Sequence, residues 1–129
     1  MKKLVNTYLF SAFLLLLMMN CTSQKSMDTK PLQRQWMMVK FEEYSKQDLM
    51  AKKAELNLTQ LETGDKSNMN ASAFMGCNRI NGSLTVKSNN QLKFNEMMMT
   101  QMACVNMRLE DSFAKKLTLV THIKLKDIS

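Results

Sequence analysis

The side chains with the greatest chemical potential cluster in the stretch GCNRINGS, residues 76–83. Its thiol, amides and guanidinium lie between two of the three glycines of the chain. The members are Gly76, Cys77, Asn78, Arg79, Asn81 and Gly82. A cysteine in such company fits three roles: a nucleophilic site, a metal site, or the covalent frame of a fold. The rest of the chain must decide between them.

A second group of sulfur atoms lies in EMMMTQMACVNM, residues 96–107. Thioether and thiolate ligands suit Cu(I), so an exported copper-binding protein is one alternative. It requires the sulfur atoms of Met98, Met102 and Cys104 to converge. The 14 methionines recur throughout the chain, however, which favours methionine as a flexible core filler. We therefore expect no metal and no cofactor.

Catalytic groups are scarce. Nucleophilic catalysis needs a base held against Ser or Cys, and an orienting group. The one histidine, His122, falls in an expected terminal strand, where an exposed or edge position is expected. The acidic pairs Glu42-Glu43 and Glu110-Asp111 are sequence neighbours that point in different directions, so we expect them at the solvated surface. No phosphate loop or dinucleotide fingerprint occurs. The sequence predicts a protein that is not an enzyme.

The first 20 residues have the layout of a secretory signal peptide: Lys2 and Lys3 precede an apolar run over residues 4–19. The run is short for a membrane-spanning helix. Its end, LMMNC, is similar to a bacterial lipobox, in which Cys21 becomes residue one, is alkylated by diacylglycerol and is N-acylated. Acyl chains then attach the protein to the membrane. Thr22 is not the aspartate that often retains such proteins at the inner membrane, so we expect the outer membrane. An ordinary secreted cysteine and an uncleaved anchor are the alternatives.

Export bears on the two remaining cysteines, because disulfides persist outside the cytosol. A bridge between Cys77 and Cys104 would close a loop of about 28 residues and add about 3–4 kcal/mol of stability. Two free thiols are the competing interpretation.

In the bridged case GCNRINGS is part of a structural frame. Gly76 would allow close approach of the chain beside the bridge, and Gly82 would relieve the turn into a hairpin. Asn78 and Asn81 would cap backbone groups of that turn.

Charge restricts the partners. Removal of residues 1–20 takes away Lys2 and Lys3 and no acid, which lowers the net charge from +7 to +5. The lysines are scattered and do not interleave with aromatics, so nucleic acid is not an expected partner. A mildly positive surface near anionic lipid headgroups is the simpler interpretation.

The mature chain begins with a polar stretch, residues 21–31, that we expect to be a tether, and one domain follows over residues 32–129. Alternating or bulky apolar residues predict strands, and Asn89-Asn90 a tight hairpin turn. The predicted strands cover residues 35–41, 54–61, 69–75, 83–87, 91–94 and 122–126. Apolar residues at helical spacing predict one amphipathic helix over about residues 106–119. The predicted fold class is α+β: a small curved antiparallel sheet packed on one amphipathic helix.

These blocks, in this order, resemble the META/HslJ domain. Its first block, GCNR and a following glycine, matches Gly76 to Arg79 and Gly82, and its second block is T-x-M-A-C ahead of a helix. The second block matches Thr100, Met102, Ala103 and Cys104, and Trp36 fits an early tryptophan strand. The resemblance covers about residues 32–128.

The resemblance implies a small α+β domain, often carried by a bacterial envelope lipoprotein, and one group of the family is heat-inducible and linked to drug tolerance. No catalytic residue follows from it. Family members usually continue with two strands after the helix, whereas only one is predicted here, so we expect an unpaired sheet edge or a short C-terminus. The expected function is a non-catalytic envelope lipoprotein that supports envelope integrity or stress tolerance. The alternative is a module that binds a peptide, a lipid or a secretion component; a protein partner is not identifiable.

Overall fold

The structure, a computed structural model, describes residues 27–62 and 64–126. The predicted signal peptide, Cys21 and the first part of the tether lie outside the described residues. The elements are η2 (Lys30–Leu32), β1 (Gln35–Met37), α2 (Lys46–Ala51), β2 (Glu55–Gln60), β3 (Asn68–Phe74), β4 (Arg79–Val86), β5 (Leu92–Met99) and α3 (Arg108–Leu117).

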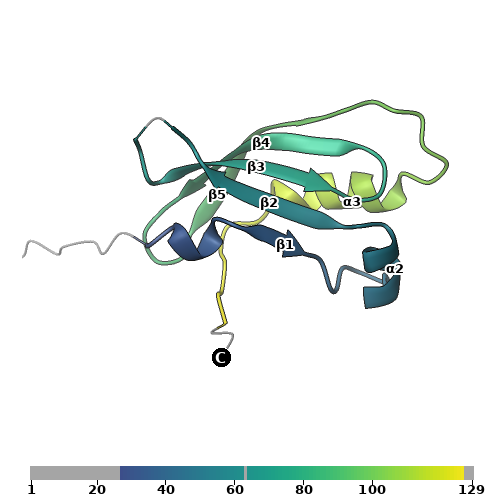
Figure 1. The fold of residues 1–129 in the computed structure, drawn as a ribbon, viewed down its shortest axis with the longest axis horizontal. Helices are drawn as coiled ribbons and strands as arrows, with labels where there is room; N and C mark the ends of the chain where they lie inside the picture. Colours follow the sequence, from purple (N-terminus) through teal and green to yellow (C-terminus); the bar gives the residue numbers. More distant parts are fainter. Residues whose placement is uncertain (1–26, 63, 127–129) are drawn as a thin grey trace, which may run out of the picture.

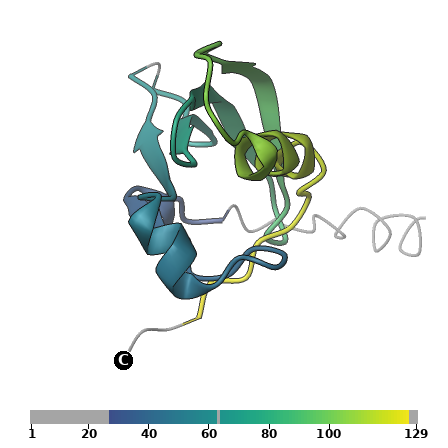
Figure 2. The same cartoon turned by 90° about the vertical axis from the view of Figure 1, so that its right-hand side faces the viewer.

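The five strands form one antiparallel sheet in the order β1-β2-β3-β4-β5 (Figure 1). Each strand pairs with its sequence neighbour. The sheet is curved, and α3 packs against its concave side (Figure 2). The predicted α+β class is therefore confirmed.

Side-chain alternation explains why these segments form a half-buried sheet. In β3, Met69, Ala71 and Ala73 are buried, while Asn70 is exposed on the other face. This is the alternation that strand geometry imposes on a sheet with one apolar face.

The predicted hairpin is also confirmed. Leu84 pairs with Phe94 and Val86 with Leu92, on the buried face. The turn residue Asn89 has a φ of 59°, and Asn90 has the same value. Asparagine tolerates this left-handed backbone better than most residues.

Helix α3 contributes the second layer of the core through Leu109, Phe113 and Leu117. Its acidic residues lie in the first turn and its lysines in the last, which complements the helix dipole. Val120, which also fits the helical spacing, lies beyond the end of α3 and is 38% exposed.

Several predicted strand boundaries are wrong. The first strand ends at Met37 rather than residue 41, β4 begins at Arg79 rather than residue 83, and β5 continues to Met99 rather than ending at residue 94. The last predicted strand, residues 122–126, does not form, because its ladder is a single bridge between His122 and Gln91. Past that bridge the chain leaves β5, and Ile123 and Leu125 line an apolar groove instead.

Helix α2 was not predicted, although its N-terminus carries a readable signal. The Ser45 hydroxyl accepts a hydrogen bond from the Asp48 backbone N–H, and the Asp48 carboxylate accepts one from the Ser45 N–H. This capping box satisfies two donors at the start of the helix. Leu49 is the one residue that α2 buries, and six residues are too few for helical periodicity to be recognised.

The capping box gives a pH-dependent prediction. Hydrogen bonds from the Ser45 hydroxyl and backbone hold the pKa of Asp48 below the ordinary aspartate value. Because the folded pKa is the lower one, the carboxylate stabilises the fold above the unfolded pKa, and this contribution is lost as pH falls through the folded pKa. Ser45→Ala is expected to raise the pKa of Asp48, as measured by NMR titration of its carboxyl carbon. An unchanged pKa in the variant would contradict the assignment.

Candidate functional site

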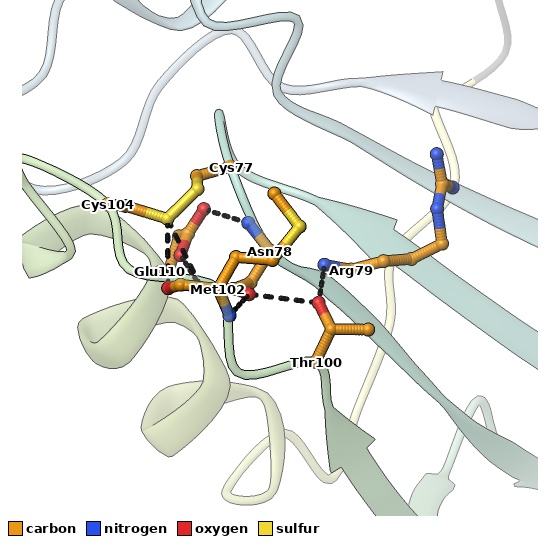
Figure 3. Close-up of a disulfide and its surroundings, with 7 residues drawn as sticks. All are labelled: Cys77, Asn78, Arg79, Thr100, Met102, Cys104 and Glu110. Carbon is orange, nitrogen blue, oxygen red and sulfur yellow. Dashed lines mark hydrogen bonds between the residues drawn. A yellow bond between two sulfur atoms is a disulfide. The ribbon is translucent and has the colours of Figure 1, made fainter.

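The disulfide predicted from the sequence is present: Cys77 and Cys104 are bonded, with Cα atoms 6.3 Å apart (Figure 3). Cys77 follows β3, and Cys104 lies in the loop between β5 and α3. The bond therefore ties the β3–β4 connection to the loop that leads into the helix. The alternative of two free thiols does not apply to this structure.

A buried polar cluster lies directly beside the disulfide, centred on Asn78, which is 0% exposed. Its side-chain oxygen accepts hydrogen bonds from the Met102 N–H at 2.8 Å and from the Thr100 hydroxyl at 2.9 Å. Its amide nitrogen donates to the Glu110 carboxylate at 3.1 Å and lies 3.4 Å from the Met102 carbonyl. Figure 3 shows these groups converging on Asn78 from the loop after β5 and from α3.

Glu110 is the second buried member, at 1% exposure. One carboxylate oxygen accepts the Asn78 backbone N–H at 2.6 Å, and the other accepts the Asn78 side-chain amide. The prediction that the Glu110-Asp111 pair lies at the solvated surface is wrong for Glu110 and correct for Asp111, which is exposed. A readable signal exists, because Glu110 precedes Phe113 by three residues and so lies on the apolar side of the helix.

The roles predicted for the two asparagines are corrected. Asn78 does cap backbone groups, but those of Met102, 24 residues away, rather than those of its own turn. Asn81 is exposed on β4. The difference arises because β4 begins at Arg79, so Asn78 ends the preceding turn while Asn81 points from the strand to solvent.

The other motif residues contribute mainly through the backbone or lie outside the cluster. The Arg79 N–H donates to the Thr100 hydroxyl at 3.0 Å, whereas the guanidinium lies on the outer face, 5.6 Å from the ring centroid of Phe74. Met102 is 57% exposed and Ala103 is exposed. The two motif blocks are therefore joined by the hydrogen bonds of Asn78 to Thr100 and Met102, and they do not form a row of exposed reactive groups.

Gly76 has a φ of 121°, a backbone conformation that strongly favours glycine. A Cβ atom there would lie 3.4 Å from the Lys52 side chain, so the backbone angle, not the available space, explains the residue. The predicted close approach beside the bridge is therefore not what requires glycine at this position, because a Cβ atom would make an ordinary van der Waals contact with Lys52.

The predicted role of Gly82 in a turn is wrong, because Gly82 lies inside β4. The pairs Asn81–Met98 and Ser83–Asn95 flank it, so Gly82 faces a bulge in β5. A Cβ atom at Gly82 would lie 2.8 Å from the Asn95 carbonyl oxygen and closer still to the Met97 sulfur.

Gly82→Ala is therefore expected to lower the free energy of unfolding by about 1–3 kcal/mol, through overpacking against the bulge. The measurement is urea unfolding followed by circular dichroism. Combining it with Met97→Ala removes the sulfur contact but not the Asn95 carbonyl, so the double variant should recover part of the loss. A neutral Gly82→Ala would contradict this account of the bulge.

Metal binding finds little support among these sulfur atoms. Ligand atoms of Cys77, Cys104 and Glu110 lie within 4.8 Å of one another. Both sulfurs are joined in the disulfide, however, and both Glu110 oxygens accept hydrogen bonds. Met98 and Met102 are 72% and 57% exposed, and Cys104 is not available as the thiolate that the copper alternative requires.

An apolar groove of about 330 Å³ is the second notable feature of the structure. Its lining comes from η2, β1, β2, the second half of β4, the start of β5, α3 and the segment that follows α3. Its floor includes Leu84 and Phe94 of the sheet and Leu117 of α3, and Trp36 of β1 forms part of its wall. Sequence reasoning did not predict it, because it depends on how the segment after α3 crosses the concave face.

Among residues 27–62 and 64–126, no helix combines the length and apolar character needed to cross a bilayer.

A curved antiparallel sheet packed on one helix, tied to the helix loop by a disulfide, defines a small α+β domain. The family model for the META domain matches residues 29–128, and the chain belongs to the META family. The family-model match begins at Thr29, a residue of the expected tether that is buried in the structure. The last residues of the expected tether therefore pack against the domain. Comparisons with curated proteins and with solved structures gave no significant match.

Proposed function

We propose that this META-domain protein is a non-catalytic lipoprotein of the bacterial cell envelope that supports envelope integrity or stress tolerance. The observation that carries the proposal is the Cys77–Cys104 disulfide. A bond of this kind persists in an oxidising compartment outside the cytosol. The lipobox-like LMMNC sequence adds acylation at Cys21 as the means of attachment, and Thr22 favours the outer membrane.

The non-catalytic part of the proposal is supported by the chemistry of the buried cluster. Each side-chain group of Asn78 and Glu110 has a partner within the protein, so neither is free to act on a substrate. In the described part of the chain, every buried side-chain nitrogen or oxygen has a hydrogen-bond partner. His122 is exposed and contacts the Thr121 hydroxyl at 2.9 Å, but among the described residues no carboxylate holds its ring in place as an orienting group would.

The intact mass of membrane-extracted protein tests attachment. The expected mass corresponds to loss of residues 1–20 and addition of the acyl groups at Cys21, and reductant should add one pair of hydrogens. Full-length mass, or an unmodified Cys21, would overturn the lipoprotein proposal. The physiological part is tested in a deletion strain: the wild-type chain should restore growth under detergent or heat stress, and Cys21→Ser should not. Equal rescue by Cys21→Ser would show that attachment is not required.

A second candidate function, a binding module, is favoured by one observation: the apolar groove. Binding sites for small molecules are typically concave, largely apolar and of about 300–1,000 Å³. The 330 Å³ groove falls within this range. The two candidates are compatible, because a lipoprotein attached to the envelope can present a binding site there.

A further inference from the structure

We infer that the apolar groove binds the acyl chain of a single-chain anionic amphiphile, such as a free fatty acid, an inference that rests on the binding-module candidate. Its chemistry follows from four features: the size of the groove, its lining, its opening to solvent and its charge.

The size fits one medium-length acyl chain. A sealed apolar cavity of about 150 Å³ accommodates benzene. By that measure the 330 Å³ groove has room for about twelve carbons. A phospholipid with two long chains is too large for it.

The lining is apolar at every position except Lys124. The floor residues Leu84 and Phe94 are 0% and 7% exposed, respectively. A ligand group on this floor finds no hydrogen-bonding side chain, so a polar ligand would lose its hydration without compensation. Burial of methylene groups is favourable there, at about 0.8 kcal/mol for each group, which is about fourfold in affinity.

The groove opens to solvent along a rim of apolar residues. Met37 is 49% exposed, and Val120 and Leu125 are each 38% exposed. A molecule in the groove therefore keeps one end in water, which favours an amphiphile over a wholly apolar ligand. An extended peptide fits less well, because its alternate side chains would point away from the apolar floor.

The charge of the rim favours an anionic head group. Lys124 is the one charged residue that lines the groove, and it is exposed. Arg34 adds a second positive charge beside the wall, with its guanidinium carbon 5.2 Å from the Trp36 ring centroid. A carboxylate at the mouth of the groove would be attracted to both groups.

Trp36 provides the readout, because it lines the groove and is the one tryptophan of the chain. The probe is dodecanoic acid brominated on its chain, which quenches tryptophan fluorescence by contact. The full chain with Cys21→Ser, which has no acyl group of its own, is titrated with the probe below its micelle concentration. Quenching is expected to saturate, and its absence would overturn the inference.

A length series distinguishes the groove from non-specific adsorption. Unlabelled fatty acids of about eight to sixteen carbons compete with the brominated probe. The affinity is expected to rise about fourfold per methylene and to level off near twelve carbons, where the groove is full. A continued rise over the whole series would indicate simple partitioning and would contradict a site of this size.

Two exposed valines form a matched pair of variants. Val120 lines the groove, whereas Val39, 57% exposed, does not. Val120→Glu is expected to weaken binding at least tenfold, and Val39→Glu to leave it unchanged, with circular dichroism confirming that both fold. Equal effects of the two valine substitutions would overturn the placement of the binding site in the groove.

Lys124→Gln should weaken binding of the fatty acid about threefold and leave binding of its methyl ester unchanged. An equal effect on both ligands would overturn the assignment of an anionic head group.

The acyl chain attached at Cys21 is a different source of the same chemistry. If it fills the groove, the lipidated wild-type protein in nanodiscs will resist quenching while Cys21→Ser is quenched. That result would overturn the assignment to a free amphiphile. Quenching of both proteins is expected. Failure of quenching would leave the lipoprotein proposal intact, since the mass measurement tests that proposal separately.

Discussion

Replacement of Asn78 by alanine is expected to lower the free energy of unfolding by about 3–4 kcal/mol. The Asn78 side chain is the common partner of the Met102 backbone, the Thr100 hydroxyl and the Glu110 carboxylate. Its removal leaves an N–H group and one oxygen of a buried carboxylate without a partner, and each such loss costs more than the hydrogen bond itself contributed. Chemical denaturation of the wild type and the variant measures the difference.

Asn81→Ala is the matched control for this prediction. Asn81 is three residues away in the same motif but is exposed on β4, so its replacement is expected to change stability by less than about 0.5 kcal/mol. The partnership with Glu110 is tested by a double-mutant cycle with Glu110→Ala. The two losses should not add, because each variant removes the same contact. Additive losses, or equal effects at Asn78 and Asn81, would show that the cluster does not act as a unit.

The second large effect is expected at the disulfide. Cys77→Ser combined with Cys104→Ser should lower the free energy of unfolding by about 3–4 kcal/mol, because a loop of about 28 residues is no longer closed in the unfolded chain. The sequence separation of the two cysteines is 27. Reductant should produce a similar loss in the wild-type protein, measured by thermal or urea unfolding.

Cys21→Ser is the control for the disulfide prediction, since it removes the remaining cysteine and should leave the stability of the domain unchanged. Reaction of the unreduced Cys21→Ser protein with a thiol reagent should detect no free sulfhydryl. Two reactive thiols would contradict the pairing. Because Asn78 and the disulfide hold the same loop, removal of both should differ from the sum of the separate losses.

GCNRINGS stabilises the fold through its connections to distant parts of the chain. Cys77 and Asn78 reach Cys104, Met102 and Glu110, all more than 20 residues further along the chain. The stretch is thus the point where the sheet, the loop after β5 and the first turn of α3 are joined.

Features that depend on neighbouring residues or on simple counting could be predicted from the sequence. Alternation placed Met69, Ala71 and Ala73 on one face, because the side-chain period of a strand is two. The Asn89-Asn90 turn followed from the tolerance of asparagine for a left-handed backbone. The pairing of Cys77 with Cys104 was predicted from the expectation of export and from the even number of cysteines left after Cys21.

Features that depend on contacts between distant segments became visible only in the folded chain. Glu110 is buried because Asn78 supplies donors to its carboxylate, and no local pattern specifies a partner 32 residues away. Gly82 is required by a bulge in the neighbouring strand rather than by a turn of its own. Residues 122–126 alternate like a strand, yet past His122 they leave β5, because packing of the half-buried Ile123 against the core competes with backbone pairing at the edge.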